Sequence, residues 1–474
     1  MASSLNDGHE NLVVDSIHGA IPLNECEVEV IDTVSFQRLC HLKQLAMAQL
    51  VYPTATHTRF AHCVGALGTM KRILATVGEN LTAEQKENHQ LAALLHDIGH
   101  YPYSHLMEKL DKVKLIEEQI EGATIPAKKS PYPDHVEVGT LIVTSQPDLI
   151  KAIGGKDRAE TVATIFARTK AADPQLSKFI HSSFDIDRWD YLLRDSYAAG
   201  VPYGQIDINY LLNNLKVSPQ KVIGFKEKAL AAVEHFLLSR FFIYRVVYYH
   251  KTIYGFEEAC RQLLRRLRDR DGERYGVPVD GEAIKNLVSS SELGMFTDAF
   301  VDSIIQKAVN DEDKTIRTIA RAIQNRKPPR LLKEVLVCEE TEQEHHRGKT
   351  FMRNCKTGIN GLAKKANIPL KQFLLCEIIL PIVKKPQKHT IAEVAKLDQQ
   401  EILDLAHEEE EEDIKIFVGE ISEPQSLMNI EHSMVVKYAS YSLQIFRLYV
   451  IYEGEDKDAV IKQLKEKVKD WDKA

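Results

Sequence analysis

The pattern of hydrophobic and polar positions changes near residue 328. Before it, apolar residues recur every three or four positions, which predicts a helical core over about residues 55–325. The clearest helical segments are 59–77, 91–97 and 298–309. After Pro328 and Pro329, short apolar runs predict strands at 332–338, 373–380, 414–420 and 445–453, followed by a terminal helix at 457–471.

These patterns predict a mainly α fold with three parts. They are an N-terminal segment 1–50, a helical core 51–328 and a smaller C-terminal α+β lobe 329–474. Within the first part, 26–45 begins with an alternating stretch that fits either a short strand or the start of a helix. The Gly-, Pro- and Lys-rich segment 122–134 is predicted to be a surface loop, and the acidic run 408–413 a solvated loop or helix end.

Composition narrows the class of protein. The chain has 474 residues, is 44% hydrophobic and carries a net charge of -7, which argues against a general nucleic-acid coat protein but leaves local basic patches open. No apolar run approaches the roughly 20 residues of a membrane helix, and the N-terminus lacks the pattern of a secretory signal. We therefore expect a soluble, cytoplasmic protein. The seven cysteines show no CxxC spacing, which predicts reduced thiols.

The segment 94-LLHDIGHYPYSH-105 carries the first candidate chemistry. An apolar run leads directly to His96 and Asp97, and His100 and His105 follow. A buried carboxylate costs several kcal/mol unless it is paired, so this pattern favours a cation or a hydrogen-bonded partner. One His-Asp pair is expected by chance among 18 histidines, and a hydrogen-bonded core histidine is the commoner explanation of such a pair taken singly.

Two more residues on predicted helices strengthen the metal hypothesis. His62 lies in HTRFAHCVG and Asp187 in FDIDRWDYLLRD, so that two histidines and two aspartates become available. Mixed imidazole and carboxylate ligands suit Mn, Fe, Zn, Ni or, less well, Mg. Four such ligands leave positions open for water and a phosphate oxygen, as hydrolysis at phosphorus requires. Gly99 favours a helix end, which would let His100 reach the same cleft.

Two predicted helices have polar stripes suited to a nucleotide. Asp187, Tyr191 and Asp195 follow one another at four-residue intervals and share a face, with metal at one end and a sugar hydroxyl at the other. A second stripe of cations and phenols suits a polyphosphate with an attached sugar. It consists of Arg240, Tyr244, Tyr248 and Lys251. For this second helix alone, an aromatic face packed in the core with arginine at its rim is the favoured alternative.

Taken together, these motifs resemble a known family. His62, His96, Asp97 and Asp187, in their sequence contexts, are similar to the HD-domain phosphohydrolase superfamily, and most of all to its deoxynucleoside triphosphate triphosphohydrolases, a branch in which HD domains also occur beside a SAM domain. The similarity begins at 15-DSIHGAIPL-23, is clear to about residue 265 and includes no SAM-domain pattern.

The resemblance implies a helical HD core, an assembly of dimers into a tetramer, and hydrolysis of a dNTP to deoxynucleoside and triphosphate. It assigns the metal ligands His62, His96, Asp97 and Asp187. It assigns phosphate contacts to Arg59, Arg188, Arg240 and Lys251, with His100 beside them. It assigns the sugar 3′ side to Gln44, Tyr191 and Asp195, and exclusion of a ribose 2′-hydroxyl to Leu45 and Tyr248. It makes His105 the general acid, supported by Glu108 and His135.

The chain departs from the pattern of this family at two places. Val136 follows His135 where the family usually has an acid. In the pocket where a guanine nucleotide activates the resembling enzymes, Asp32 and Gln37 match, but Cys40 replaces an arginine and Asn11 a lysine. A cysteine cannot supply a guanidinium fork, so we expect activation by a guanine nucleotide to be absent or altered.

Two other functions compete with this interpretation. One is an HD enzyme acting on monophosphates, cyclic dinucleotides or alarmones, against which Leu45, Tyr248 and the phosphate-directed cations argue. The other is a nucleotide sensor or a single-strand nucleic-acid-binding protein that keeps its metal for structure. The complete ligand set together with His105 favours an enzyme.

Overall fold

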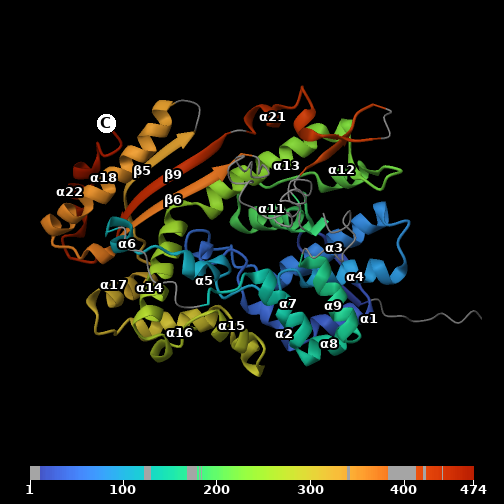
Figure 1. Ribbon diagram of the computed structural model, residues 1–474, viewed down its shortest axis with the longest axis horizontal. Coiled ribbons are helices and arrows are strands. Elements are labelled where there is room, and N and C mark those ends of the chain that lie inside the picture. The colour runs from blue at the N-terminus through green and yellow to red at the C-terminus, as the bar shows by residue number, and fades with distance from the viewer. Residues whose placement is uncertain are drawn as a thin grey trace, which may run out of the picture.

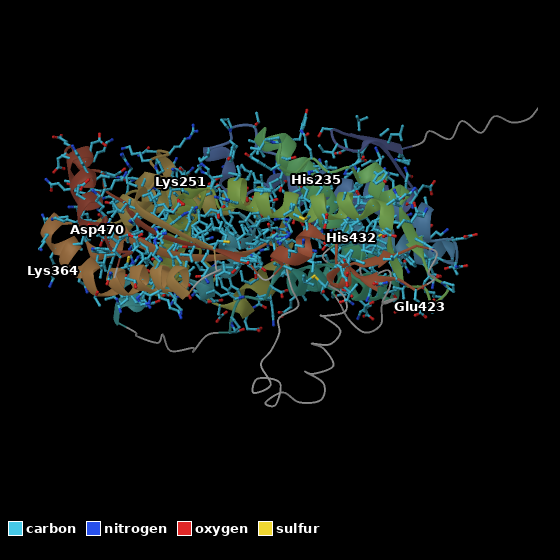
Figure 2. The ribbon with its side chains drawn as sticks, turned by 90° about the horizontal axis from the view of Figure 1, so that it is seen from above. His235, Lys251, Lys364, Glu423, His432 and Asp470 are labelled. Atoms are coloured by element: carbon cyan, nitrogen blue, oxygen red, sulfur yellow. The ribbon has the colours of Figure 1, made fainter. Side chains whose placement is uncertain are left out.

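The computed structural model describes residues 11–121, 130–167, 179–180, 182, 184–338, 342–382, 413–419, 423–439 and 441–473. The molecule is elongated, with most of the helices of the first 330 residues toward one end and a three-stranded sheet with two long helices at the other (Figure 1). Seen from above, Lys364 and Asp470 mark the end formed by the C-terminal region (Figure 2).

The N-terminal segment forms a hairpin followed by a helix. Strands β1 (Asn11–Asp15) and β2 (Gly19–Leu23) pair antiparallel, and α1 (Glu25–Ile31) follows. A capping box starts α1: the Asn24 side chain accepts a hydrogen bond from the Glu27 backbone N–H, and the Glu27 carboxylate accepts one from the Asn24 backbone N–H. This cap satisfies two helix-end donors at once, and the ambiguous start of 26–45 is therefore helical.

The helical core is built around α3, whose residues Cys63, Leu67 and Met70 are fully buried. The helices predicted at 59–77, 91–97 and 298–309 are confirmed as α3, the end of α4 and α16. The helices of this region are α2 (Val34–Gln37), α3 (Arg59–Val77), α4 (Ala83–Leu95), α5 (His105–Glu108), α6 (Ile116–Glu121), α7 (His135–Ser145), α8 (Pro147–Ile153), α9 (Lys156–Phe166), α11 (Ile186–Ala199), α12 (Ile208–Asn213), α13 (Leu230–Ile243), α14 (Lys251–Tyr275), α15 (Gly281–Val288), α16 (Asp298–Ala308) and α17 (Lys314–Gln324).

The C-terminal sheet consists of three antiparallel strands with β9 (Ser442–Val450) between β5 (Arg330–Cys338) and β6 (Phe373–Pro381). Side chains alternate between its two faces. Leu375 joins a cluster with residues of α18 (Glu342–Ala366) and α22 (Lys457–Val468), whereas Leu374 belongs to the main core, as do residues of α14. The predictions of three strands and a terminal helix here, and of a mainly α fold with a smaller strand-containing C-terminal region, are confirmed.

The fourth predicted strand, at 414–420, forms in a different sheet. β7 (Lys415–Phe417) pairs parallel with β4 (Ile223–Lys226), in the order β3 (Leu215–Val217), β4, β7, β8 (Gln425–Ser426); α21 (Met434–Tyr438) follows. The β3–β4 hairpin was not predicted, because three- and four-residue strands are too short to show a period of two. The division of the chain at 328/329 stays a prediction.

Two sequence predictions fall largely where no structure is described. Residues 122–129 of the predicted loop and 408–412 of the acidic run lie outside the described residues. None of the helices in the described part of the chain is both long and apolar enough to cross a membrane.

Candidate active site

Three elements bring the predicted metal ligands together. His62 lies in the first turn of α3, His96 and Asp97 follow α4 directly, and Asp187 lies in the first turn of α11. One ligand atom each of His62, His96 and Asp187 lies within 4.8 Å of the other two. The Asp97 carboxylate stands between the histidines, 3.5 Å from each Nε2 atom. The structure therefore places the four candidate ligands in one cluster.

The two histidines are held in the tautomer that a metal requires. His62 Nδ1 lies 2.7 Å from an Asp190 oxygen, and His96 Nδ1 lies 2.8 Å from the Ala93 carbonyl oxygen. Since carboxylate and carbonyl oxygens accept, each Nδ1 carries a proton, which leaves each Nε2 as the atom that a metal would bind. Both Nε2 atoms are buried without a donor from the described residues directed at them, and Asp187 Oδ1 lies 3.0 Å from that of His62. A divalent cation fits this donor set, in which outer oxygens orient the imidazoles.

The charges of the cluster also call for a cation. Burial alone would lower the pKa of His62, yet Asp187, Asp190 and Asp97 raise it to about 10, so without a metal ion Nε2 would take a second proton at the position that a cation would fill. Burial opposes ionisation of Asp97, but the Arg59 guanidinium and two neighbouring imidazoles hold its pKa well below the usual range. The site thus keeps its carboxylates ionised and attracts positive charge.

The turn after Asp97 is fixed by a close approach to α7. Helix α4 ends at Leu95, so His96 and Asp97 project from a turn. The helix end predicted near Gly99 is present, but Gly99 does not have the positive φ of a left-handed helix cap. A Cβ atom at Gly99 would overlap the His135 carbonyl oxygen and the Gly139 backbone. Because Gly99 has no side chain, the turn formed by residues 96–99, called the HD turn below, packs closely on α7. His100 Nε2 then lies 3.2 Å from Asp97 Oδ1.

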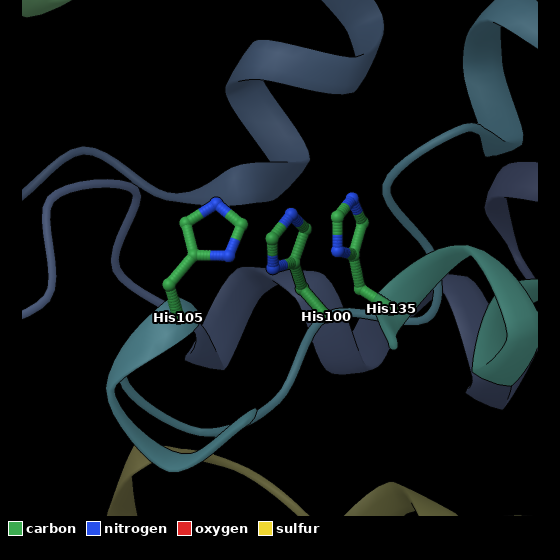
Figure 3. A group of neighbouring side chains, drawn as sticks. All are labelled: His100, His105 and His135. Carbon is green, nitrogen blue, oxygen red and sulfur yellow. The ribbon is translucent and has the colours of Figure 1, made fainter. Parts of the chain in front are cut away.

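A second histidine group adjoins the first (Figure 3). The His100 and His135 rings stack with centroids 4.2 Å apart, and the His105 centroid lies 5.0 Å from that of His100. Glu108 bridges the outer pair: its carboxylate accepts from Nδ1 of His105 and, at 2.9 Å, from Nδ1 of His135. Both Nε2 atoms are thereby oriented toward the same side of the group. The predicted support of His105 by Glu108 and His135 has a direct geometric counterpart.

A strained turn precedes His105. Tyr103 and Ser104 have φ values of 53° and 56°, which residues other than glycine rarely adopt. The turn is held by hydrogen bonds: the Tyr103 N–H donates to Asp298 at 2.7 Å, and the Ser104 hydroxyl accepts from the Arg59 guanidinium at 2.8 Å. Such strain persists where the surroundings fix it, and here it sets the direction of the His105 side chain, which is 51% exposed.

Helix α11 connects the ligand cluster to the predicted sugar contacts. Asp195 is buried two turns beyond Asp187, and its carboxylate accepts a hydrogen bond from the Tyr248 hydroxyl. The Tyr191 and Tyr248 rings meet edge to face at 6.1 Å. His57 Nε2 lies 2.7 Å from the other Asp195 oxygen. Gln44 is buried, and its backbone N–H donates to the carbonyl of this same His57 at 3.0 Å. Its neighbour Leu45 packs against the core.

The four predicted phosphate ligands have varied surroundings. Arg59 is buried and donates to Asp97 and Ser104, which puts a guanidinium beside the ligand cluster. Arg188 pairs with Asp185 at 3.0 Å in the first turn of α11. Arg240 is buried and donates to the carbonyl oxygen of Pro381 at 3.2 Å, while Lys251 is exposed at the start of α14 (Figure 2). Their roles toward phosphate stay predictions.

The predicted stripe from Arg240 to Lys251 does not lie on one continuous α-helix. Helix α13 ends at Ile243, and Tyr244–Tyr248 form a π-helical turn before α14 begins. The Tyr249 N–H donates to the Tyr244 carbonyl at 2.8 Å, a five-residue step that rotates the following side chains. Such turns are frequent at functional sites. This one brings the Tyr248 hydroxyl to Asp195.

Sequence reasoning missed the residues behind the ligands. Asp190 lies one turn after Asp187 and could have been found from its position on the same helix. His18 and His57 come from distant turns and contact carboxylates of α11 through folding alone, which no spacing in the sequence reveals.

Comparison with known proteins agrees with the motifs. Residues 59–195 match the HD-domain family model. Residues 59–195 are therefore similar to an HD domain, and the resemblance of the motifs to that family is confirmed. An uncharacterized protein of Methanocaldococcus jannaschii is 36% identical over 51% of this chain and 46% of its own length. A protein of Dictyostelium discoideum named as a SAMHD1 homolog, a deoxynucleoside triphosphate triphosphohydrolase, is 29% identical over 51% of this chain and 46% of its own.

The fold is shared over nearly the whole chain with a solved structure. The crystal structure of a phosphohydrolase from Bacteroides thetaiotaomicron covers 93% of this chain and 99% of its own, with a TM-score of 0.68 at 20% identity. This likeness shows the fold. By contrast, the chain spans about half the length of the curated relatives it matches.

Proposed function

We propose that this protein hydrolyses deoxynucleoside triphosphates to deoxynucleoside and inorganic triphosphate. One observation carries the proposal: a single helix, α11, presents Asp187 to the ligand cluster and, two turns on, the Asp195 carboxylate that Tyr248 holds. Eight residues of helix span roughly 12 Å. That separation suits a phosphoryl group at the metal end and a deoxyribose at the other. The relatives named as dNTP triphosphohydrolases support the same reaction.

His62, His96, Asp97 and Asp187 would hold a divalent metal ion, with Mn, Fe, Zn, Ni or Mg compatible with the donors. When bound, such an ion polarises a phosphoryl oxygen and makes water a better nucleophile. Arg59 lies beside Asp97 and adds a fixed positive charge where negative charge develops on the α-phosphoryl oxygens. Arg188, Arg240 and Lys251 would complete the binding of the triphosphate.

In the proposed reaction, the oxygen of water forms a bond to the α-phosphorus and the bond from that phosphorus to O5′ breaks. His105 gives its proton to O5′ and the deoxynucleoside leaves. The attacking water releases a proton to solvent, and solvent returns a proton to His105, so that the overall change is the addition of one water molecule. The pKa of the half-exposed His105 is lowered by partial desolvation of its ring, and the Glu108 carboxylate, bridged to His105 and His135, opposes this shift and so favours the protonated imidazole that the step needs. A positioned acid of this kind contributes about 10²- to 10⁴-fold.

Sugar selection would come from the other end of the site. Asp195, Tyr191 and Gln44 would contact the 3′ side, where carboxylate and amide groups recognise a hydroxyl. Leu45 and Tyr248 would fill the space that a 2′-hydroxyl requires. The assembly into dimers or tetramers, a cytoplasmic location and an altered response to guanine nucleotides are further parts of this proposal.

The experiment is a substrate panel. Purified protein with Mn²⁺ or Mg²⁺ is incubated with each dNTP and rNTP, singly, in mixtures and with GTP, and the products are separated by anion exchange. We expect deoxynucleoside and triphosphate from dNTPs, lost in Asp97→Ala, with no strict requirement for GTP. Intact dNTPs under all conditions would refute the proposal, and turnover of another phosphorylated substrate would assign a different HD activity.

A further inference from the structure

The outer side of His62 belongs to a buried network that reaches the N-terminal hairpin. Asp190 is fully buried, and one of its oxygens lies 2.7 Å from His62 Nδ1. Its other oxygen lies 2.7 Å from His18 Nε2, and Arg194 donates to both oxygens at 2.7 and 2.8 Å. The Asp190 carboxylate thus joins a candidate metal ligand to His18, which lies 172 positions before Asp190 in the sequence.

The hairpin turn is built to deliver His18 to this carboxylate. Asp15 Oδ1 accepts from the backbone N–H groups of Ile17 at 2.8 Å and His18 at 2.9 Å, which closes the turn. The other Asp15 oxygen accepts from Arg194 at 2.8 Å. The side chains of Asp15 and His18 therefore attach the turn to α11, and the His18 side chain is 3% exposed.

Two glycines of α3 make room for these contacts. A Cβ atom at Gly65 would overlap Asp190 and Arg194, and one at Gly68 would lie 2.9 Å from the side chain of Ile21 in β2. On the opposite side of the hairpin, Val14 is 84% exposed. An isolated two-stranded hairpin is marginally stable, so the position of this one depends on the contacts of His18, Asp15 and Ile21.

We propose that the hairpin 11–23 stabilises the metal centre, with His18 as a positioning residue that acts through Asp190. With four donors on it, the Asp190 carboxylate cannot rotate, and it holds His62 with its Nε2 lone pair toward the site. Loss of an outer-shell partner of a metal ligand typically weakens binding 10- to 100-fold. The proposal requires a metal at His62, whatever substrate the enzyme takes.

The test measures metal retention directly. The full-length protein is loaded with Zn²⁺, and transfer of the ion to a chromogenic chelator is followed for wild type, His18→Ala, His18→Gln and His235→Ala. We expect up to about 10-fold faster release from His18→Ala, at the lower end of the range for direct partners of a ligand, because His18 acts through Asp190. His18→Gln, whose amide can donate to Asp190, should restore most of the retention, and His235→Ala, an exposed change on α13, should leave it unchanged.

A thermal melt of the metal-free variants separates positioning from general stability. Equal release from wild type and His18→Ala, with both folded, would overturn the proposal, as would equal acceleration by His18→Ala and His235→Ala. If His18→Ala does not fold, Asp15→Asn is tested in its place. This substitution weakens the turn that positions His18 but retains the His18 side chain. Faster Zn²⁺ release from Asp15→Asn then supports the role of the hairpin at the metal centre, and unchanged release contradicts it. In an Asp190→Asn background, His18→Ala should add no further acceleration.

Discussion

Replacing Gly99 by alanine tests why the HD turn contains a glycine. The added methyl group would overlap the His135 carbonyl oxygen and the backbone of Gly139, and neither can move without shifting α7. Overpacking of this kind costs about 1–3 kcal/mol, and rigid backbone on both sides places the cost at the upper end. The lower entropy of the unfolded alanine chain returns about 0.4–1 kcal/mol. We therefore expect Gly99→Ala to destabilise the protein by about 2 kcal/mol.

The assay is urea unfolding followed by far-UV circular dichroism, with Gly361→Ala as the matched control. Gly361 lies exposed on α18, and a Cβ atom there would meet nothing within 4 Å. The same substitution should raise stability at that position by up to about 1 kcal/mol, because alanine is the better helix former. A stability of Gly99→Ala equal to or above that of wild type would refute the close-packing explanation.

Three further predictions concern turnover, pH and specificity. His105→Ala should lower kcat by about 10²- to 10⁴-fold with little change in KM, in steady-state assays; unchanged kcat would remove His105 from the proton transfer. Burial raises the pKa of Glu257 from 4.5 to about 7, although nearby cations oppose this shift. The free energy of unfolding therefore falls as the pH rises through this interval. Glu257→Gln should therefore be more stable than wild type by up to roughly 3 kcal/mol at pH 8, and this gain should shrink toward pH 5.5 in urea unfolding; a gain independent of pH would contradict the shift. Tyr248→Ala should admit ribonucleotides and raise the rNTP-to-dNTP ratio of kcat/KM, whereas an unchanged ratio would exclude Tyr248 from sugar selection.

The sequence predicted the parts of the molecule that depend on local pattern. Helix α3 has a helical period and the strands β5, β6 and β9 have apolar runs of their own, and the ligands His62, His96, Asp97 and Asp187 lie on or beside predicted helices. Their clustering follows once those helices pack together.

Contacts made across the fold could not be predicted in this way. His18 and His57 reach Asp190 and Asp195 from turns far away in the sequence, and no spacing records such pairs. The strands β3 and β4 have only three and four residues, so neither carries a pattern and their hairpin was not predicted, whereas the apolar run at β7 was. The π-helical turn at Tyr244–Tyr248 was also not predicted, because a single extra residue in a helix leaves the hydrophobic period almost unchanged.

The most direct test of the central claim is hydrolysis of a dNTP in H₂¹⁸O, with the products analysed by mass spectrometry. Attack of water on the α-phosphorus predicts one ¹⁸O atom in the triphosphate and none in the deoxynucleoside, with no label incorporated by Asp97→Ala. Label in the 5′-hydroxyl of the deoxynucleoside, or release of monophosphate or pyrophosphate in place of triphosphate, would contradict the account.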